Sequence, residues 1–116
     1  MINLSVTITQ GINNKANARR DFTTYLSKSK SRYIVSYKNI YLGKNPSTFP
    51  GLILRISKFV ESEAYDSIGG WMDKKTNMYW LDANLHFDTL EVATEIATKN
   101  GELAIYDTLT NEVINL

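Results

Sequence analysis

Apolar and polar residues alternate strictly at the start of the chain. The even positions 2, 4, 6 and 8 are apolar, and Asn, Ser and Thr fill the odd positions between them. A period of two is typical of a strand with one buried face, so the pattern predicts a strand over residues 2–9. From residue 15 to residue 28 the apolar positions recur at spacings of three and four, which predicts an amphipathic helix.

The middle of the chain gives one clear segment, one loop and one ambiguity. Residues 32–42 are rich in Tyr, Ile and Val, which predicts a strand. Residues 43–51 contain both prolines and predict a loop. Residues 52–60 fit both the strand period and the helix period. The preceding Pro50–Gly51 pair and the β-branched and aromatic content favour a strand there.

The C-terminal half shows a more regular pattern. Residues 68–72 and 78–87 predict the two arms of a hairpin, with the odd positions of the second arm on one face. Asp88 is expected to cap a following helix, because Glu91 stands three residues further on in a capping-box relation. Asn100 and Gly101 should end that helix.

Residues 103–106 and 113–116 predict two last strands. The fold class expected is therefore α+β, with a mainly antiparallel sheet, two helices and the C-terminal order β-β-α-β-(β). A length of 116 residues, 43% of them hydrophobic and 22% charged, fits one small domain over residues 1–116.

Charge is unevenly distributed along the chain. Residues 1–58 carry ten Lys or Arg and one acid, whereas residues 59–116 carry three Lys and eleven acids. The basic half thus has a formal charge of +9 and the acidic half −8, within a total of +1. Such segregation indicates charged partners, or attraction between the two halves.

Composition excludes several kinds of chemistry. The chain has no cysteine, which rules out disulfides, thiolate metal sites and cysteine nucleophiles and suits a reducing compartment. The first ten residues do not fit a signal peptide, and no run reaches the roughly 20 apolar residues of a membrane span. We therefore expect a soluble, cytoplasmic protein without a membrane partner.

The single histidine does not suggest catalysis. His86 lies on the polar face of its predicted strand, and spacing places no serine, threonine or carboxylate beside it. Asp82 and Asp88 lie near His86 in the sequence, but Asp88 is better explained as a helix cap, so we expect no metal. No catalytic set and no cofactor motif emerges. The chain is predicted not to be an enzyme.

The basic half contains a candidate nucleic-acid surface. Lysines and arginines contact phosphates, and aromatic rings stack on bases. The candidate residues are Lys28, Lys30, Arg32, Lys38 and Lys44.

Three tyrosines lie among these cations. On an unbroken strand Tyr33, Tyr37 and Tyr41 share one face, which is either core or a stacking platform, depending on whether Ile34 or Val35 points inward. We expect Tyr37 in the core, binding by charge alone, and an exposed basic link over residues 27–32.

The acidic half contains a candidate protein-binding surface. Glu61, Glu63 and Asp66 cluster before the hairpin. Their charges either solvate the surface or imitate the spaced charge of a nucleic acid and so bind a basic groove in a partner. We expect these three to be the partner-binding residues.

The run GGWMDKKTNMYWLDANLHFDTLEVATEIATKNGELAIYD carries a resemblance. Gly69-Gly70-Trp71, Tyr79-Trp80 before Asp82, the capped helix and residues 104–107 resemble the C-terminal pattern of small accessory proteins of phages and mobile elements. The resemblance covers about 40 of the 116 residues. It implies a small protein that inhibits a host system by binding, as anti-CRISPR proteins do, and no catalytic residue follows from it.

Three functions are open at this point. The first is a stoichiometric inhibitor of a host anti-phage defence system, with a CRISPR effector as the favoured protein or ribonucleoprotein partner. The alternative is a nucleic-acid-binding accessory protein that uses the basic half. The third is a structural subunit that assembles head to tail through its oppositely charged halves, while the inhibitor is expected as a monomer or small homo-oligomer.

Overall fold

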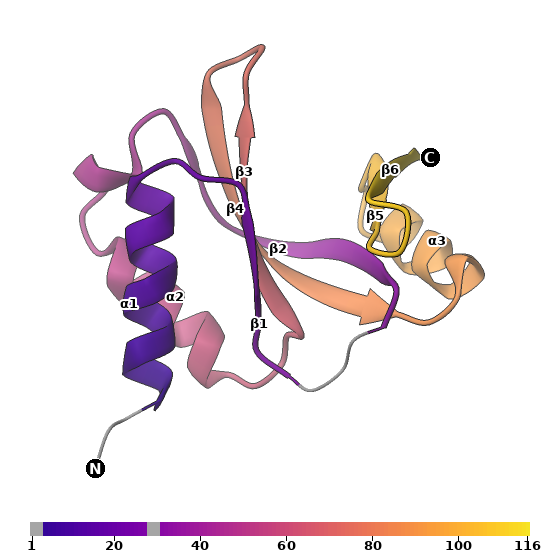
Figure 1. Ribbon diagram of the computed structural model, residues 1–116, viewed down its shortest axis with the longest axis horizontal. Helices are drawn as coiled ribbons and strands as arrows, with labels where there is room; N and C mark the ends of the chain where they lie inside the picture. Colours follow the sequence, from indigo (N-terminus) through magenta and orange to yellow (C-terminus); the bar gives the residue numbers. More distant parts are fainter. Residues whose placement is uncertain (1–3, 28–30) are drawn as a thin grey trace.

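The computed structural model describes residues 4–27 and 31–116 (Figure 1). In chain order the elements are α1 (Leu4–Asn17), β1 (Phe22–Tyr25), β2 (Tyr33–Gly43), the 3-10 turn η1 (Pro46–Thr48), α2 (Leu52–Glu61), β3 (Ser67–Asp73), β4 (Met78–Phe87), α3 (Leu90–Lys99), β5 (Ala104–Asp107) and β6 (Glu112–Asn115). The predicted α+β class is confirmed. The described residues form three α-helices, however, where two were expected.

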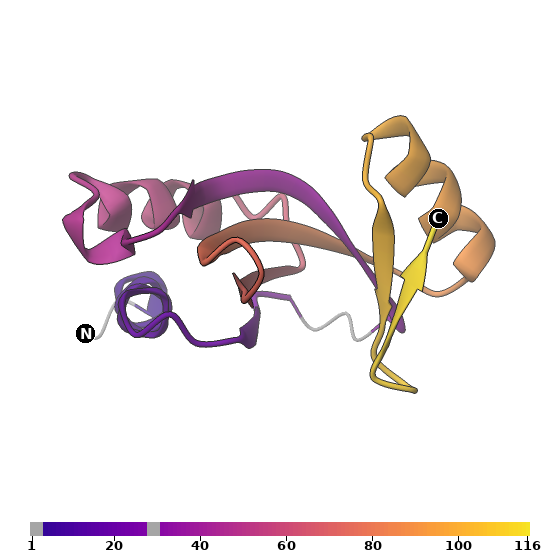
Figure 2. The same cartoon turned by 90° about the horizontal axis from the view of Figure 1, so that it is seen from above.

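The strands form one antiparallel sheet in the order β1-β3-β4-β2-β5-β6. The sheet is curled, so its β1–β3 end and its β5–β6 end face each other, with the helices on the outer sides (Figure 2). Strand β2 of the basic half therefore lies between β4 and β5 of the acidic half, and β1 of the basic half forms one edge of the sheet beside β3. The two halves of the chain are not two separate lobes.

Two hydrophobic clusters lie along the helix-covered face of the sheet. The first joins α1 and α2 to β3, β4 and the end of β2, and the second joins α3 to β5 and the start of β2. Tyr79, Leu81 and Ala83 alternate inward along β4, as its sequence pattern predicted. No helix of the described residues covers the opposite face.

The N-terminal predictions were wrong. Residues 4–17 form α1 instead of a strand, because the inward-facing positions are Thr9, Ile12 and Ala16, at helical spacing. Thr9 also satisfies its hydroxyl within the helix, by donating to the carbonyl of Ser5 at 2.8 Å. The short alternation before Thr9 reflects positions that stay largely exposed, not a buried strand face.

The helix predicted over residues 15–28 is also absent. Its first residues end α1, and Arg19 follows with a φ of 55°. Residues 22–25 then form β1, which pairs with β3. Phe22 pairs with Gly70, where an added Cβ would collide with the rings of Phe22 and Tyr79. Pairing with β3 and packing over this glycine outweigh the local helical period.

The ambiguous segment 52–60 is helical, not a strand. Leu52, Ile56 and Val60 are buried at spacings of four, and Gly51 precedes the helix with a φ of 77°. The Pro50–Gly51 pair thus introduces a helix here. Both periods were present in the sequence, and contact with α1 selects the helical one.

The C-terminal order β-β-α-β-β is confirmed, including the last strand. The cap of α3 is Thr89 and not Asp88, since the Thr89 hydroxyl accepts a hydrogen bond from the Val92 N–H at 3.3 Å. Helix α3 ends as predicted at Asn100, and Gly101 takes a φ of 72°.

Two bulges in β2 decide where its tyrosines point. The register against β4 shifts between Ser36 and Lys38 and again between Asn39 and Tyr41. Bulges break the alternation of faces. Tyr41 is therefore only 6% exposed, whereas Tyr37 is 38% exposed and contacts Tyr65. The expectation that Tyr37 belongs to the core was wrong.

The sequence left open whether Ile34 or Val35 points into the core, and the structure buries both. Ile34 and Val35 are both buried, one on each face of the sheet. Tyr33 is buried with Val35 against α3. The three tyrosines therefore do not form one stacking platform.

Two truncations test this assignment. We expect Tyr41→Ala to lower the free energy of unfolding by about 3 kcal/mol or more, because it empties a buried site. Tyr37→Ala should cost about 1 kcal/mol, because it removes chiefly one ring contact. Urea denaturation of both variants measures the difference, and equal losses would contradict the bulged register.

Candidate binding surfaces

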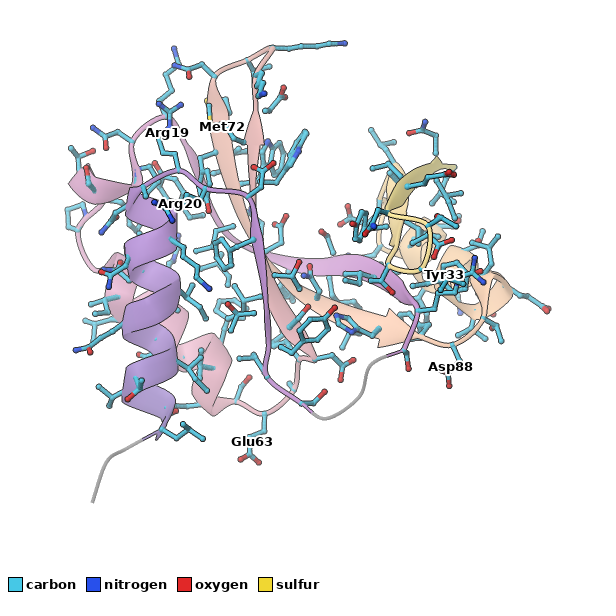
Figure 3. The ribbon with its side chains drawn as sticks, in the orientation of Figure 1. Arg19, Arg20, Tyr33, Glu63, Met72 and Asp88 are labelled. Atoms are coloured by element: carbon cyan, nitrogen blue, oxygen red, sulfur yellow. The ribbon has the colours of Figure 1, made fainter. Side chains whose placement is uncertain are left out.

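Cations gather where the end of α1 meets the tip of the β3–β4 hairpin. The Arg19 guanidinium donates to the side-chain oxygen of Asn77 at 2.6 Å and to its carbonyl at 3.0 Å. The Tyr79 hydroxyl donates to the carbonyl of Arg20 at 2.9 Å. These contacts fix both arginines beside the hairpin (Figure 3).

Other cations extend this surface. Lys15 lies 5.4 Å above the ring of Phe22, and Lys44 directly follows the end of β2, where Gly43 pairs with Tyr79. We call the following set the basic edge: Lys15, Arg19, Arg20, Lys44, Lys74 and Lys75. Two acids lie among them, Asp21 and Asp73, and each accepts a hydrogen bond from a backbone N–H of the hairpin.

The predicted nucleic-acid residues are not brought together. Lys28 and Lys30 lie outside the described residues, as does the stretch 28–30 of the predicted basic link. Lys44 belongs to the basic edge, and Lys38 is exposed beside the first bulge of β2.

Arg32 has a structural role. Its guanidinium pairs with both carboxylate oxygens of Asp107 at 2.8 Å and lies 4.9 Å from the ring centre of Tyr33. The hydrogen bonds from Arg32 hold the pKa of Asp107 well below its usual range. This pair joins the start of β2 to the end of β5.

The predicted acidic residues separate in a similar way. Glu61 and Glu63 are exposed at the end of α2, and Glu63 has a φ of 56°. The carboxylate of Asp66 instead accepts from the Ser27 hydroxyl at 3.0 Å and from the His86 N–H at 2.9 Å. Asp66 thus links the ends of β1, β3 and β4.

A second group of acids lies on the α3 side of the molecule, away from Glu63 (Figure 3). Glu91 and Glu95 are exposed four residues apart on α3, Asp88 is exposed two residues before the helix, and we call these three the acid row. Ala93 and Ala97 hold the opposite side of the helix in the core. These acids were not predicted as a site from the sequence, although the spacing of four between Glu91 and Glu95 in a predicted helix was a signal for it.

The acid row lies among apolar side chains. Leu90 and Val92 are exposed on the same helix. Glu95 has one intrachain partner, Lys99 at 3.3 Å, and both side chains are largely exposed, so this pair stabilises little. Residues 88–116 contain six acids and one lysine, which makes this end of the molecule acidic.

The structure places a serine beside the histidine, which spacing did not predict. The Ser67 hydroxyl lies 2.7 Å from Nε2 of His86, and the Asn84 amide donates to the same hydroxyl at 3.1 Å. The register of β3 against β4 creates this contact, because Ser67 pairs with Asn84, two residues before His86.

This pair is a buried structural contact. Ser67 is 0% exposed, so no substrate reaches its hydroxyl. Nδ1 of His86 has no hydrogen-bond partner among the described residues, so no carboxylate orients the ring as in a catalytic triad. Burial lowers the pKa of His86, and the charge of Asp66 only partly opposes this effect.

Two kinds of feature are absent from the described residues. No three His, Asp or Glu side chains gather closely enough to hold a metal ion. None of the helices there is both long and apolar enough to cross a membrane.

No family model, curated protein or solved structure matches this chain. The resemblance to phage accessory proteins stays a prediction.

The buried histidine makes stability depend on pH. Because the pKa of His86 is lower in the folded state, the unfolded chain takes up its proton first as the pH falls below about 6.5. We expect the free energy of unfolding to fall between pH 7 and pH 5, by at most about 1.4 kcal/mol per pH unit. His86→Gln should flatten this slope in urea denaturation, and an unchanged slope would contradict the assignment.

Proposed function

We propose that this chain is a non-catalytic binding protein that covers the nucleic-acid-binding surface of a partner protein. The acid row on α3 is the observation that carries the proposal. Glu91 and Glu95 lie about 6 Å apart along the helix axis, since each residue rises about 1.5 Å, and Asp88 adds a third carboxylate just before the helix. A cluster of one charge sign complements a basic groove.

The apolar neighbours of the acid row favour a protein as the partner. Leu90 and Val92 expose aliphatic carbon beside the carboxylates. Exposed apolar side chains rimmed by charge are typical of protein interfaces, and a nucleic acid would be repelled by the acids. The same helix therefore offers both steering by charge and burial of apolar surface.

A CRISPR effector is the candidate partner that we favour. Effectors hold their guide–target duplex in a positively charged channel and contact its backbone more than its sequence. The resemblance to anti-CRISPR-like phage proteins points to the same class. On this proposal the chain acts in the host cytoplasm as a stoichiometric inhibitor.

Charge reversal tests the acid row. We expect Glu91→Lys with Glu95→Lys to abolish capture of the partner from nuclease-treated host lysate, because two attractions become repulsions. The exposed pair Glu61→Lys with Glu63→Lys serves as the matched comparison, since it makes the same change in charge at the end of α2, away from α3. The first variant should also lose any protection of phage plating on CRISPR-active hosts.

Two results would contradict this proposal. If only the Glu61 and Glu63 reversals abolish capture, the partner contacts the end of α2 and the acid row is the wrong surface. If nuclease removes every captured protein from the wild-type chain, the proposed function is wrong.

The basic edge supports a second candidate function, binding of nucleic acid. The six cations of the basic edge come from α1, the loop after it, the end of β2 and the hairpin tip, and the two acids among them accept hydrogen bonds from backbone N–H groups. Contacts of this kind bind phosphates without reading sequence. The acid row at the other end of the molecule then stays in solvent.

Mobility shift assays at low salt test this second function. Arg20→Ala with Lys74→Ala should weaken binding to single- and double-stranded probes and lower the salt dependence, because each lost phosphate contact reduces the slope by about one. Lys58→Ala, which removes one positive charge on α2 outside the basic edge, is the control and should leave the slope unchanged. Absence of any shift at tens of micromolar protein would reject nucleic-acid binding.

A further inference from the structure

The helix-free face of the sheet is hollowed into a trough of about 580 Å³. Ile34, Ser36, Asp82 and Asn84, from β2 and β4, form its floor. Residues of β1 and β3 form one wall, and residues of β5 and β6 form the other, which follows from the curl of the sheet (Figure 2). The volume falls within the range of ordinary ligand sites.

The floor of the trough is held open by local structure. Gly69 pairs with Asp82 and therefore lies on the trough face of β3. A Cβ at Gly69 would lie 3.0 Å from the amide nitrogen of Asn84, so a larger residue would crowd the floor. After the bulge between Ser36 and Lys38, the shifted register of β2 places Asn39 opposite Asp82.

The trough is negative. Two carboxylates line it, Asp21 and Asp82, and its lining, which lies entirely within the described chain, includes no Lys, Arg or His. Asp82 takes part in neither of the two ion pairs found among the described residues. A phosphate or another anion is therefore disfavoured there.

The carboxylate of Asp82 is oriented but incompletely satisfied. The Asn39 amide donates to one oxygen at 2.9 Å, and the Ser36 hydroxyl approaches the other at 3.4 Å. Burial raises the pKa of Asp82, and the pKa of Glu102 is also raised, first by burial and then by the charge of Asp82. A cation placed at this carboxylate would relieve both costs.

Aromatic rings stand on both walls. Trp71 of β3 is 53% exposed, and Tyr106 of β5 is also exposed. A guanidinium is planar, so it pairs with a carboxylate through two parallel hydrogen bonds and also stacks on aromatic faces. An ammonium is a compact point charge and lacks this planar, two-pronged geometry. Ile34 offers an apolar surface to the aliphatic stem.

We propose that the trough binds an arginine side chain presented by the partner protein, with Asp82 as the ion-pair partner and Trp71 as the stacking surface. This inference rests on the proposed function, because basic nucleic-acid-binding surfaces supply exposed arginines. It adds a second contact to that of the acid row, on a different face of the molecule.

The probe for this site is the blocked tripeptide acetyl-Gly-Arg-Gly-amide, titrated into the isotope-labelled chain and followed by NMR. We expect the amide signals of Gly69, Trp71 and Asp82 to shift and saturate. The same peptide with glutamine in place of arginine should leave them unchanged. Equal shifts with both peptides, or none at tens of millimolar peptide, would overturn the proposal.

Three variants sharpen the test. Asp82→Asn keeps the shape of the side chain and should weaken peptide binding by about tenfold or more, because the charge is lost. Trp71→Ala, at an exposed position that does not endanger folding, should weaken it severalfold. Glu112→Gln, at an exposed acid outside the trough lining, should leave the affinity for the peptide unchanged. An equal loss of affinity in this control would show that the peptide responds only to the overall charge and would reject the site.

The partner experiment separates the two proposals. If the peptide fails to bind while the Glu91 and Glu95 reversals still abolish capture, the proposed function stands and the trough assignment is wrong. If the peptide binds as expected but no protein partner is captured, the trough binds arginine and the proposed function is wrong.

Discussion

The pairing of β2 with β4 determines how the rest of the molecule is arranged. These two long strands run through the centre of the sheet and connect its two ends. The bulges after Ser36 and Asn39 twist β2 against its partner, which curls the sheet. Because the sheet is curled, α1 and α2 cover one end and α3 covers the other, each with its own hydrophobic cluster. The same curl hollows the opposite face into the trough.

The C-terminal half was predictable because each element carried its own local signals. Alternation in β4, the polar turn before it and the Asn100–Gly101 stop after α3 all agree with the structure. The N-terminal half was not, because its elements depend on distant partners. Helix α1 is selected by packing on α2, and β1 exists as a strand because β3 lies beside it. The bulges of β2 left no sign in the alternation of its tyrosines, so the exposure of Tyr37 could not be foreseen.

The charge distribution along the sequence also differs from the distribution in the folded structure. The basic and acidic halves interleave in the sheet, so the two halves of the chain are not two oppositely charged lobes. Local clusters remain instead, namely the basic edge, the acid row and the negative trough. Among the residues named from the sequence, Arg32 and Asp66 hold the fold together through Asp107, Ser27 and His86. Burial and intrachain pairing distinguish these structural residues from charged residues that are available to a partner. The sequence alone shows neither property.

The central claim is that this chain occupies a surface on its partner that otherwise binds nucleic acid. A competition experiment with the captured partner tests it most directly, using the partner's own nucleic acid as the competitor at constant ionic strength. The account predicts mutually exclusive binding, so that increasing nucleic acid releases this chain and no ternary complex appears on sizing chromatography. A stable complex of all three components would contradict it.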